Sequence, residues 1–144
     1  MTRKILVPID ESDRSSDALE YALTEYGDET IIALHVINPR EFFSAGGIES
    51  GITANQEQLQ EAAEGRAEEV LDSARDETMA RGVEIETETL IGDVANSIVS
   101  YADEQAVDHI VIGSHGRSGA SRVLLGSVAE TVTRRAAVPV TVVR

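Results

Sequence analysis

Segments typical of β-strands alternate along this chain with segments typical of α-helices, and this alternation limits the fold more than any other feature. The strand-like segments are apolar runs or strict alternations at Arg3–Ile9, Thr30–Ile37, Val83–Leu90, His109–Gly113 and Val138–Val143. Each is followed, except the last, by apolar residues at helical spacing. The order β-α-β-α-β-α-β-α-β predicts a parallel sheet with helices on both faces. We therefore expect one doubly wound, Rossmann-like α/β domain over residues 1–144, with five strands in the order 3-2-1-4-5.

Two of the strand-like segments carry the marks of sheet edges. The run VEIETETL at Val83–Leu90 alternates glutamate with apolar residues or threonine, which predicts a strand with one face in water. The last run contains Pro139, which cannot donate a hydrogen bond to a neighbouring strand. Both segments are therefore expected at the outside of the sheet.

The composition excludes several classes of protein. The chain has no cysteine, which rules out a disulfide framework, a thiolate nucleophile and thiolate-bound zinc. Its 26 Asp and Glu against 12 Lys and Arg give a net charge of −14, and Lys4 is the single lysine. Such a balance is typical of halophilic proteins that work in high internal salt, although an ordinary acidic protein would look the same. It argues against binding to nucleic acid or to an anionic membrane. No apolar run is long enough to span a membrane and no signal peptide is visible, so we expect a cytoplasmic protein.

The stretch GSHGRSGASRVLLGS at Gly113–Ser127 holds four of the eleven glycines and is locally positive, since Arg117 and Arg122 are its only charged residues. Glycines let a ligand approach the backbone, and amides in such a turn and at a helix N-terminus attract anions. The two arginines either neutralise phosphates or point into solvent. Ser127 is either the N-cap of the last helix or a hydroxyl donor to a phosphate. The stretch matches neither the Walker loop, which needs a lysine, nor the dinucleotide fingerprint.

Ligands of doubly wound folds bind at the carboxyl ends of the strands, where the strand order reverses. Asp10 follows the first strand and Gly113 ends the fourth, so both are expected at one crevice. An aspartate beside a nucleotide most naturally accepts hydrogen bonds from ribose hydroxyls. The three histidines, His35, His109 and His115, show neither metal-ligand spacing nor a nucleophile–base pair.

The whole chain resembles the universal stress protein family. The resemblance rests on KILVPID, LHVI, HIVIGSHG, LLGSVAETV and VPVTVV, in that order. The glycines and serine of G-x2-G-x9-G-S match the signature of the ATP-binding branch. One departure is Ile9, where family members often carry threonine.

The resemblance implies a nucleotide site of defined residues. Asp10 would bind the ribose, Val36 would pack on the adenine, and backbone amides with the Ser127 hydroxyl would hold the phosphates, Arg117 lying in the same loop. The full implied set is Pro8, Ile9, Asp10, Val36, Ile112, Gly113, Gly116, Arg117, Gly126, Ser127 and Val128.

The resemblance also implies a function and a partner. It implies a stress-response regulatory protein that binds ATP, or AMP or ADP, with Mg²⁺ or Mn²⁺ reaching the site only through the phosphates. It implies a homodimer through the last strand, Val138–Val143. Little or no ATP hydrolysis is expected, because the predicted site contains no evident general base or pair of arginines arranged for in-line attack on a phosphate. Two alternatives stay open: a slow ATP hydrolase on the same fold, and a dimeric chaperone-like module that needs no nucleotide.

Overall fold

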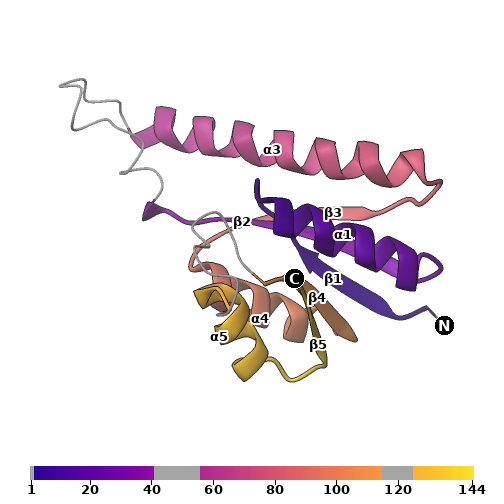
Figure 1. Cartoon of the computed structure of the whole chain (residues 1–144). Coiled ribbons are helices and arrows are strands. Elements are labelled where there is room, and N and C mark those ends of the chain that lie inside the picture. Colours follow the sequence, from indigo (N-terminus) through magenta and orange to yellow (C-terminus); the bar gives the residue numbers. More distant parts are fainter. Residues whose placement is uncertain (1, 41–55, 115–124) are drawn as a thin grey trace.

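The computed structural model describes residues 2–40, 56–114 and 125–144, and these form one parallel sheet with helices on both faces (Figure 1). The elements in chain order are β1 (Lys4–Pro8), α1 (Asp13–Tyr26), β2 (Thr30–Ile37), α3 (Gln56–Ala80), β3 (Glu86–Ile91), α4 (Val94–Glu104), β4 (His109–Gly113), α5 (Ser127–Arg135) and β5 (Val140–Val143). The strand order is β3-β2-β1-β4-β5, with every neighbouring pair parallel. The predicted fold class, strand order and edge positions of β3 and β5 are confirmed.

Along the inner strands, successive side chains pack alternately in two separate apolar layers, one on each face of the sheet. Ile5 and Val7 of β1 pack with α1 and α3, whereas Leu6 between them packs with α4 and α5. Figure 1 shows the same division, with α1 and α3 on one side of the sheet and α4 and α5 on the other. Because side chains alternate along a strand, a strand buried on both faces needs apolar residues at successive positions, and the buried residues of β1, β2 and β4 form such runs.

The third strand begins later than the sequence predicts, at Glu86 rather than Val83. The turn after α3 uses the intervening residues. Gly82 has a φ of +73°, its N–H bonds to the Met79 carbonyl, and the Val83 N–H bonds to the Thr78 carbonyl. These two bonds are the helix-ending motif that glycine favours, so Val83 closes the helix instead of starting the strand.

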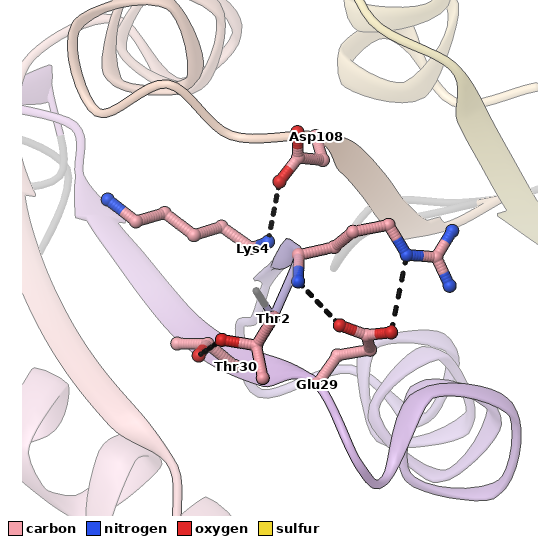
Figure 2. Close-up of polar contacts among 6 residues, drawn as sticks. Thr2, Lys4, Glu29, Thr30 and Asp108 are labelled. Carbon is pink, nitrogen blue, oxygen red and sulfur yellow. Dashed lines mark hydrogen bonds and ion pairs between the residues drawn. The ribbon is translucent and has the colours of Figure 1, made fainter.

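The amino end of the sheet is joined by polar contacts (Figure 2). The Lys4 N–H donates to Asp108 Oδ2 at 2.8 Å, and the Arg3 N–H donates to Glu29 Oε2 at 2.5 Å. The Thr2 and Thr30 hydroxyls lie 3.2 Å apart. These contacts join the start of β1 to the segments that enter β4 and β2, at the end of the sheet opposite to the predicted site.

Candidate functional site

The carboxyl ends of β1 and β4 form the switch point of the sheet. From β1 the chain moves to β2 on one side, while β4 lies on the other. Five residue pairs join β1 to β2 up to Pro8 and Leu34, but the pairs joining β1 to β4 end at Leu6 and Ile110. β1 and β4 are thus no longer paired with each other toward their carboxyl ends, which is where ligands bind in such sheets.

Asp10 stands at this rim, in a turn built by the serines that follow it. Its N–H donates to Ser15 Oγ at 2.8 Å, and its Oδ1 accepts from the Ser12 N–H at 2.7 Å. Ser12 is also the N-cap of α1, since its Oγ accepts from the Ser15 N–H. The run DESDRSS therefore both starts the helix and orients the carboxylate. Within the described residues Oδ2 makes no hydrogen bond, so one oxygen of Asp10 is held in the turn and the other can accept.

His35 supports this turn from β2. Its Nδ1 lies 2.9 Å from the carbonyl oxygen of Ile9. Because a carbonyl only accepts, Nδ1 must carry the proton. The ring thereby anchors the residue next to Asp10. Sequence reasoning placed His35 on a strand and did not assign it this contact; its position near the end of an inner strand was the available signal.

The apolar residues of the predicted site are divided between the two faces of the sheet. Val36 and Ile112 are buried in the layer under α4 and α5, and Val128 packs at its margin. Ile9 is buried in the opposite layer, beside α1, while Pro8 is half-buried at the end of β1. The fold thus brings Val36 and Ile112 into one cluster at the carboxyl end and directs Ile9 away from them.

The glycine-rich stretch is closed at its base by backbone hydrogen bonds. The Gly126 N–H donates to the Ser114 carbonyl at 2.7 Å, and the Ser114 N–H donates to the Val143 carbonyl at 2.8 Å. Ser114 is 2% exposed. The start of α5 is therefore held against the end of β4, and both are tied to the end of β5. The predicted residues Gly116 and Arg117, with His115 and Arg122, lie outside the described residues.

The start of α5 contradicts one of the two interpretations of Ser127, its role as the N-cap. Gly126 is the N-cap, with φ −62° and ψ 157°, and Ser127 is the first residue of the helix. In the described part of the chain no side chain makes a capping hydrogen bond to this helix start. The N-cap interpretation of Ser127 is wrong, because Gly126 already adopts the extended backbone of that position. The Ser127 side chain is exposed and its hydroxyl is not needed by the helix end.

Gly113 is a glycine for a structural reason. A Cβ at this position would stand 2.6 Å from the carbonyl oxygen of Arg14 and 3.0 Å from its Cβ. The first turn of α1 therefore occupies the space beside Gly113, and the close approach at this glycine is made by the protein's own backbone.

His109 lies at the other end of β4 and takes no part in this rim. Its Nε2 lies 2.7 Å from Thr141 Oγ1, and its ring is 5.4 Å from that of Tyr26. Burial lowers the pKa of His109, and the charge of Arg3 lowers it further. These contacts agree with a packing role.

The described residues hold no group of three or more His, Asp or Glu side chains that could bind a metal ion. Across the same residues, no helix is long and apolar enough to cross a membrane.

The comparisons with known proteins agree on one family. The model of the universal stress protein family matches residues 1–144. Universal stress protein MJ0531 of Methanocaldococcus jannaschii is 35% identical, over 99% of this chain and 82% of the relative. Universal stress protein YxiE of Bacillus subtilis is 33% identical over the full length of both chains.

Solved structures give the same result. The structure of MJ0577 has a TM-score of 0.80 at 30% identity, with 99% of this chain and 96% of the other covered. A universal stress protein in complex with cAMP has a TM-score of 0.70 at 26% identity, covering 99% and 97%. The universal stress protein of Archaeoglobus fulgidus in complex with dAMP has a TM-score of 0.65 at 25% identity, covering 100% and 98%.

Proposed function

The chain belongs to the universal stress protein family, and we propose that it is a regulatory protein of the ATP-binding branch that holds an adenine nucleotide with little or no turnover. Relatives of the same fold have been solved with cAMP and dAMP, which supports an adenine nucleotide as the ligand class. ATP is the proposed nucleotide because the chain carries the full G-x2-G-x9-G-S spacing.

The observation that carries the proposal is the uncapped start of α5. Helix N-termini leave their first N–H groups without helical partners, and among the residues that the structure describes no side chain bonds to those of α5. These amides, with the Ser127 hydroxyl, suit the terminal phosphates of a nucleotide. Gly126 is bonded to the end of β4, so the phosphate-binding end of α5 stands at the switch point of the sheet.

Asp10 is the proposed ribose ligand. Its turn fixes Oδ1 with the Ser12 N–H, which leaves Oδ2 to accept from a ribose hydroxyl. The apolar residues at the same rim, Val36 and Ile112, suit the adenine ring. Pro8, Ile9 and Gly113 contribute backbone near the sugar, and Val128 contributes a phosphate-facing amide. Gly116 and Arg117 complete the proposed phosphate loop.

Any Mg²⁺ or Mn²⁺ would reach this site on the nucleotide. Asp10 is the one predicted site residue with a carboxylate. Mg²⁺ in nucleotide sites is usually bound by one or two carboxylates together with the phosphates of the substrate. We therefore propose that the phosphates supply most of the metal's ligands, with water completing the shell.

The proposal also includes a homodimer through the outer edge of β5. All four residues of β5 are uncharged, either valine or threonine. The Pro139 carbonyl accepts from the Ile110 N–H of β4 and the Val143 carbonyl from the Ser114 N–H just after β4, so Val140 and Val142 direct their backbone groups outward. Val142→Pro would remove an outward N–H and spare those that face β4. Light scattering should then report a monomer, and a dimer in this variant would contradict the proposed interface.

Two further proposals follow from composition: a cytoplasmic location, and adaptation to high salt. With a net charge of −14, self-repulsion should be screened by salt, so the midpoint of thermal unfolding should rise steeply in molar KCl. A midpoint that does not change with KCl would remove the halophilic interpretation and leave an ordinary acidic protein.

The nucleotide proposal is tested by calorimetric titration with ATP, ADP and AMP. Asp10→Asn keeps Oδ1 as the acceptor for the Ser12 N–H and removes the charge, and Ser127→Ala removes a hydroxyl that caps nothing. Each variant should weaken ATP binding roughly tenfold, which is about 1.4 kcal/mol. Ser73→Ala, at an exposed position of α3, is the matched control.

Two outcomes would replace the proposal. Steady turnover of about 1 s⁻¹ or more, near the lower end of enzyme rates, would make the protein an ATP hydrolase if it is lost in both variants. Failure to bind any adenine nucleotide below about millimolar, a free energy of about −4 kcal/mol, would favour the nucleotide-independent chaperone-like module.

A further inference from the structure

The two outer strands of the sheet differ in charge. In the described part of the chain, β3 pairs with β2 on one side and with no strand on the other. Its sequence, ETETLI, places Glu86 and Glu88 on this open strand, whereas β5 carries no charge. An unpaired strand edge can accept another extended segment, and its charges decide which segments are tolerated.

The glutamates of β3 point to the α4 face of the sheet. Leu90, which lies on the same face as Glu86 and Glu88, packs in the apolar layer with α4. Thr87 faces the other side, where its hydroxyl accepts from Arg75 Nη2 at 2.5 Å. Both carboxylates of the edge strand therefore stand on the side of the sheet that α4 covers.

A groove of about 400 Å³ runs between β3 and α4 on this face. Its walls carry the carboxylates of Glu88 and Glu104 and several hydroxyl and amide groups, and its apolar part comes from Leu90 and Tyr101. The lining set, which contains no lysine, arginine or histidine, is Glu88, Leu90, Ile91, Asn96, Ser97, Ser100, Tyr101, Glu104 and Gln105. Arg135 of α5 reaches its margin, where its Nη1 donates to Asn96 Oδ1.

Tyr101 reports the electrostatic potential of the groove. Burial raises the pKa of its hydroxyl above the ordinary value of 10.0, and the carboxylates of Glu88 and Glu86 raise it further. The edge carboxylates therefore act at the phenol of α4, across the groove, and not only toward solvent. A positive charge placed between them would be attracted to both walls and to the tyrosine ring.

We propose that the free edge of β3 and the adjoining groove form a docking surface for an extended, basic segment of a partner protein, which adds to the sheet as a sixth strand. The Gly92 N–H bonds to the Ile37 carbonyl of β2, so by alternation Thr87, Thr89 and Ile91 direct their backbone groups outward to the added strand. Lysine or arginine side chains on its α4 face lie beside Glu86 and Glu88, an opposite-charge pairing that stabilises neighbouring strands. Ile91, 48% exposed, gives an apolar contact at the end of the strand.

A second copy of this chain does not fit the same edge. Pairing β3 with β3 would bring the glutamates of both copies onto one face, and like charges on adjacent strands are destabilising. The surface is also separate from the proposed nucleotide site, because β2 lies between β3 and the switch point. Binding of a peptide at this edge is therefore expected to be independent of nucleotide binding.

The test uses the full-length protein and a labelled peptide of about ten alternating valines and lysines, long enough to span the six residues of β3 at about 3.3 Å per residue. A peptide with glutamate in place of lysine is its control. Fluorescence anisotropy should show binding of the basic peptide alone. Amide NMR shifts should concentrate at Thr87, Thr89 and Ile91 and on the face of α4 that contains Tyr101.

Matched variants separate this surface from general charge attraction. E86Q/E88Q removes two exposed edge carboxylates, and E68Q/E69Q removes two exposed carboxylates of α3 with the same change in net charge. The first pair should weaken peptide binding about tenfold, or about 1.4 kcal/mol, and the second less than about twofold. Equal losses in both pairs, or binding of the acidic peptide as well, would overturn the proposal and leave the glutamates as charges that only keep the edge unpaired.

Discussion

Gly113 and Arg14 are in backbone contact: a Cβ on Gly113 would stand 2.6 Å from the Arg14 carbonyl oxygen. The pair joins the last residue of β4 to the first turn of α1, and Asp10 lies in the turn that enters the same helix. The geometry of the rim therefore depends on the absence of a side chain at this one position.

Gly113→Ala should destabilise the protein by about 1–3 kcal/mol, the usual cost of overpacking, because the neighbouring atoms are backbone and cannot rotate away. Urea unfolding would measure the loss as a lower midpoint at an unchanged slope. Gly65→Ala is the control, since a Cβ there has nothing within 4 Å inside α3. It should raise stability by roughly 0.5–1 kcal/mol through helix propensity. If both variants unfolded at the wild-type midpoint, the Arg14 contact would not be the reason for this glycine.

His35 should position Asp10 through the Ile9 carbonyl. His35→Leu removes the donor and should cost about 0.5–1.5 kcal/mol of stability, and it should weaken nucleotide binding more than it weakens folding. His35→Asn can still present an N–H close to the position of Nδ1 and should recover part of both losses. The measurements are urea unfolding and calorimetric titration with ATP. Equal binding by the leucine and asparagine variants would show that the hydrogen bond does not position the rim.

His109 should make stability depend on pH in a narrow window. Its pKa in the folded protein lies below the ordinary value of 6.5, first because of burial and then because of Arg3, so the unfolded chain takes up the proton more readily. The stability that the neutral ring contributes is present in full above 6.5 and is lost as the pH falls below that value, through the lower pKa of the folded state. The urea midpoint should therefore fall between about pH 7 and pH 5.5.

His109→Gln is the comparison for this effect, because glutamine does not titrate and can still approach Thr141 Oγ1. Its urea midpoint should change less than that of the wild type over the same window, where few carboxylates titrate. Parallel curves for the two proteins would mean that the ring is equally easy to protonate in the folded and unfolded states.

Tyr101 should ionise at a lower pH once the edge carboxylates are neutralised. Burial is the first cause of its raised pKa and the charges of Glu88 and Glu86 come second, so E86Q/E88Q should lower the pKa part of the way toward 10.0. Alkaline absorbance titration, with Tyr101→Phe subtracted to remove the other tyrosines, would measure the shift. E68Q/E69Q should leave the titration unchanged, and a shift as large in that pair would mean that the whole acidic surface raises the pKa.

The elements of this protein were predictable because their patterns are local. Apolar residues at every second position of a strand, or at every third or fourth position of a helix, indicate which face of the element is buried. This pattern is the same whichever neighbouring element covers that face. Thr30–Ile37 and His109–Gly113 were predicted with the observed bounds for this reason. The glutamates at every second position placed β3 at an edge, and the position of Asp10 after β1 placed it at the rim.

The contacts that shape the rim follow no such local pattern. His35 makes a hydrogen bond to the Ile9 carbonyl, 26 residues earlier in the sequence. Gly113, at the end of β4, packs against the backbone of Arg14 in α1, near the start of the chain. The cap of α5 falls on Gly126 and not on Ser127, because the bond to Ser114 holds Gly126 in an extended backbone at the end of β4. Periodicity records that a side chain is buried, but the partner that buries it is chosen only when distant segments pack. That is why the sequence predicts which elements meet at this site, whereas the closed base of the loop, the supporting histidine and the acidic groove of β3 depend on the folded chain.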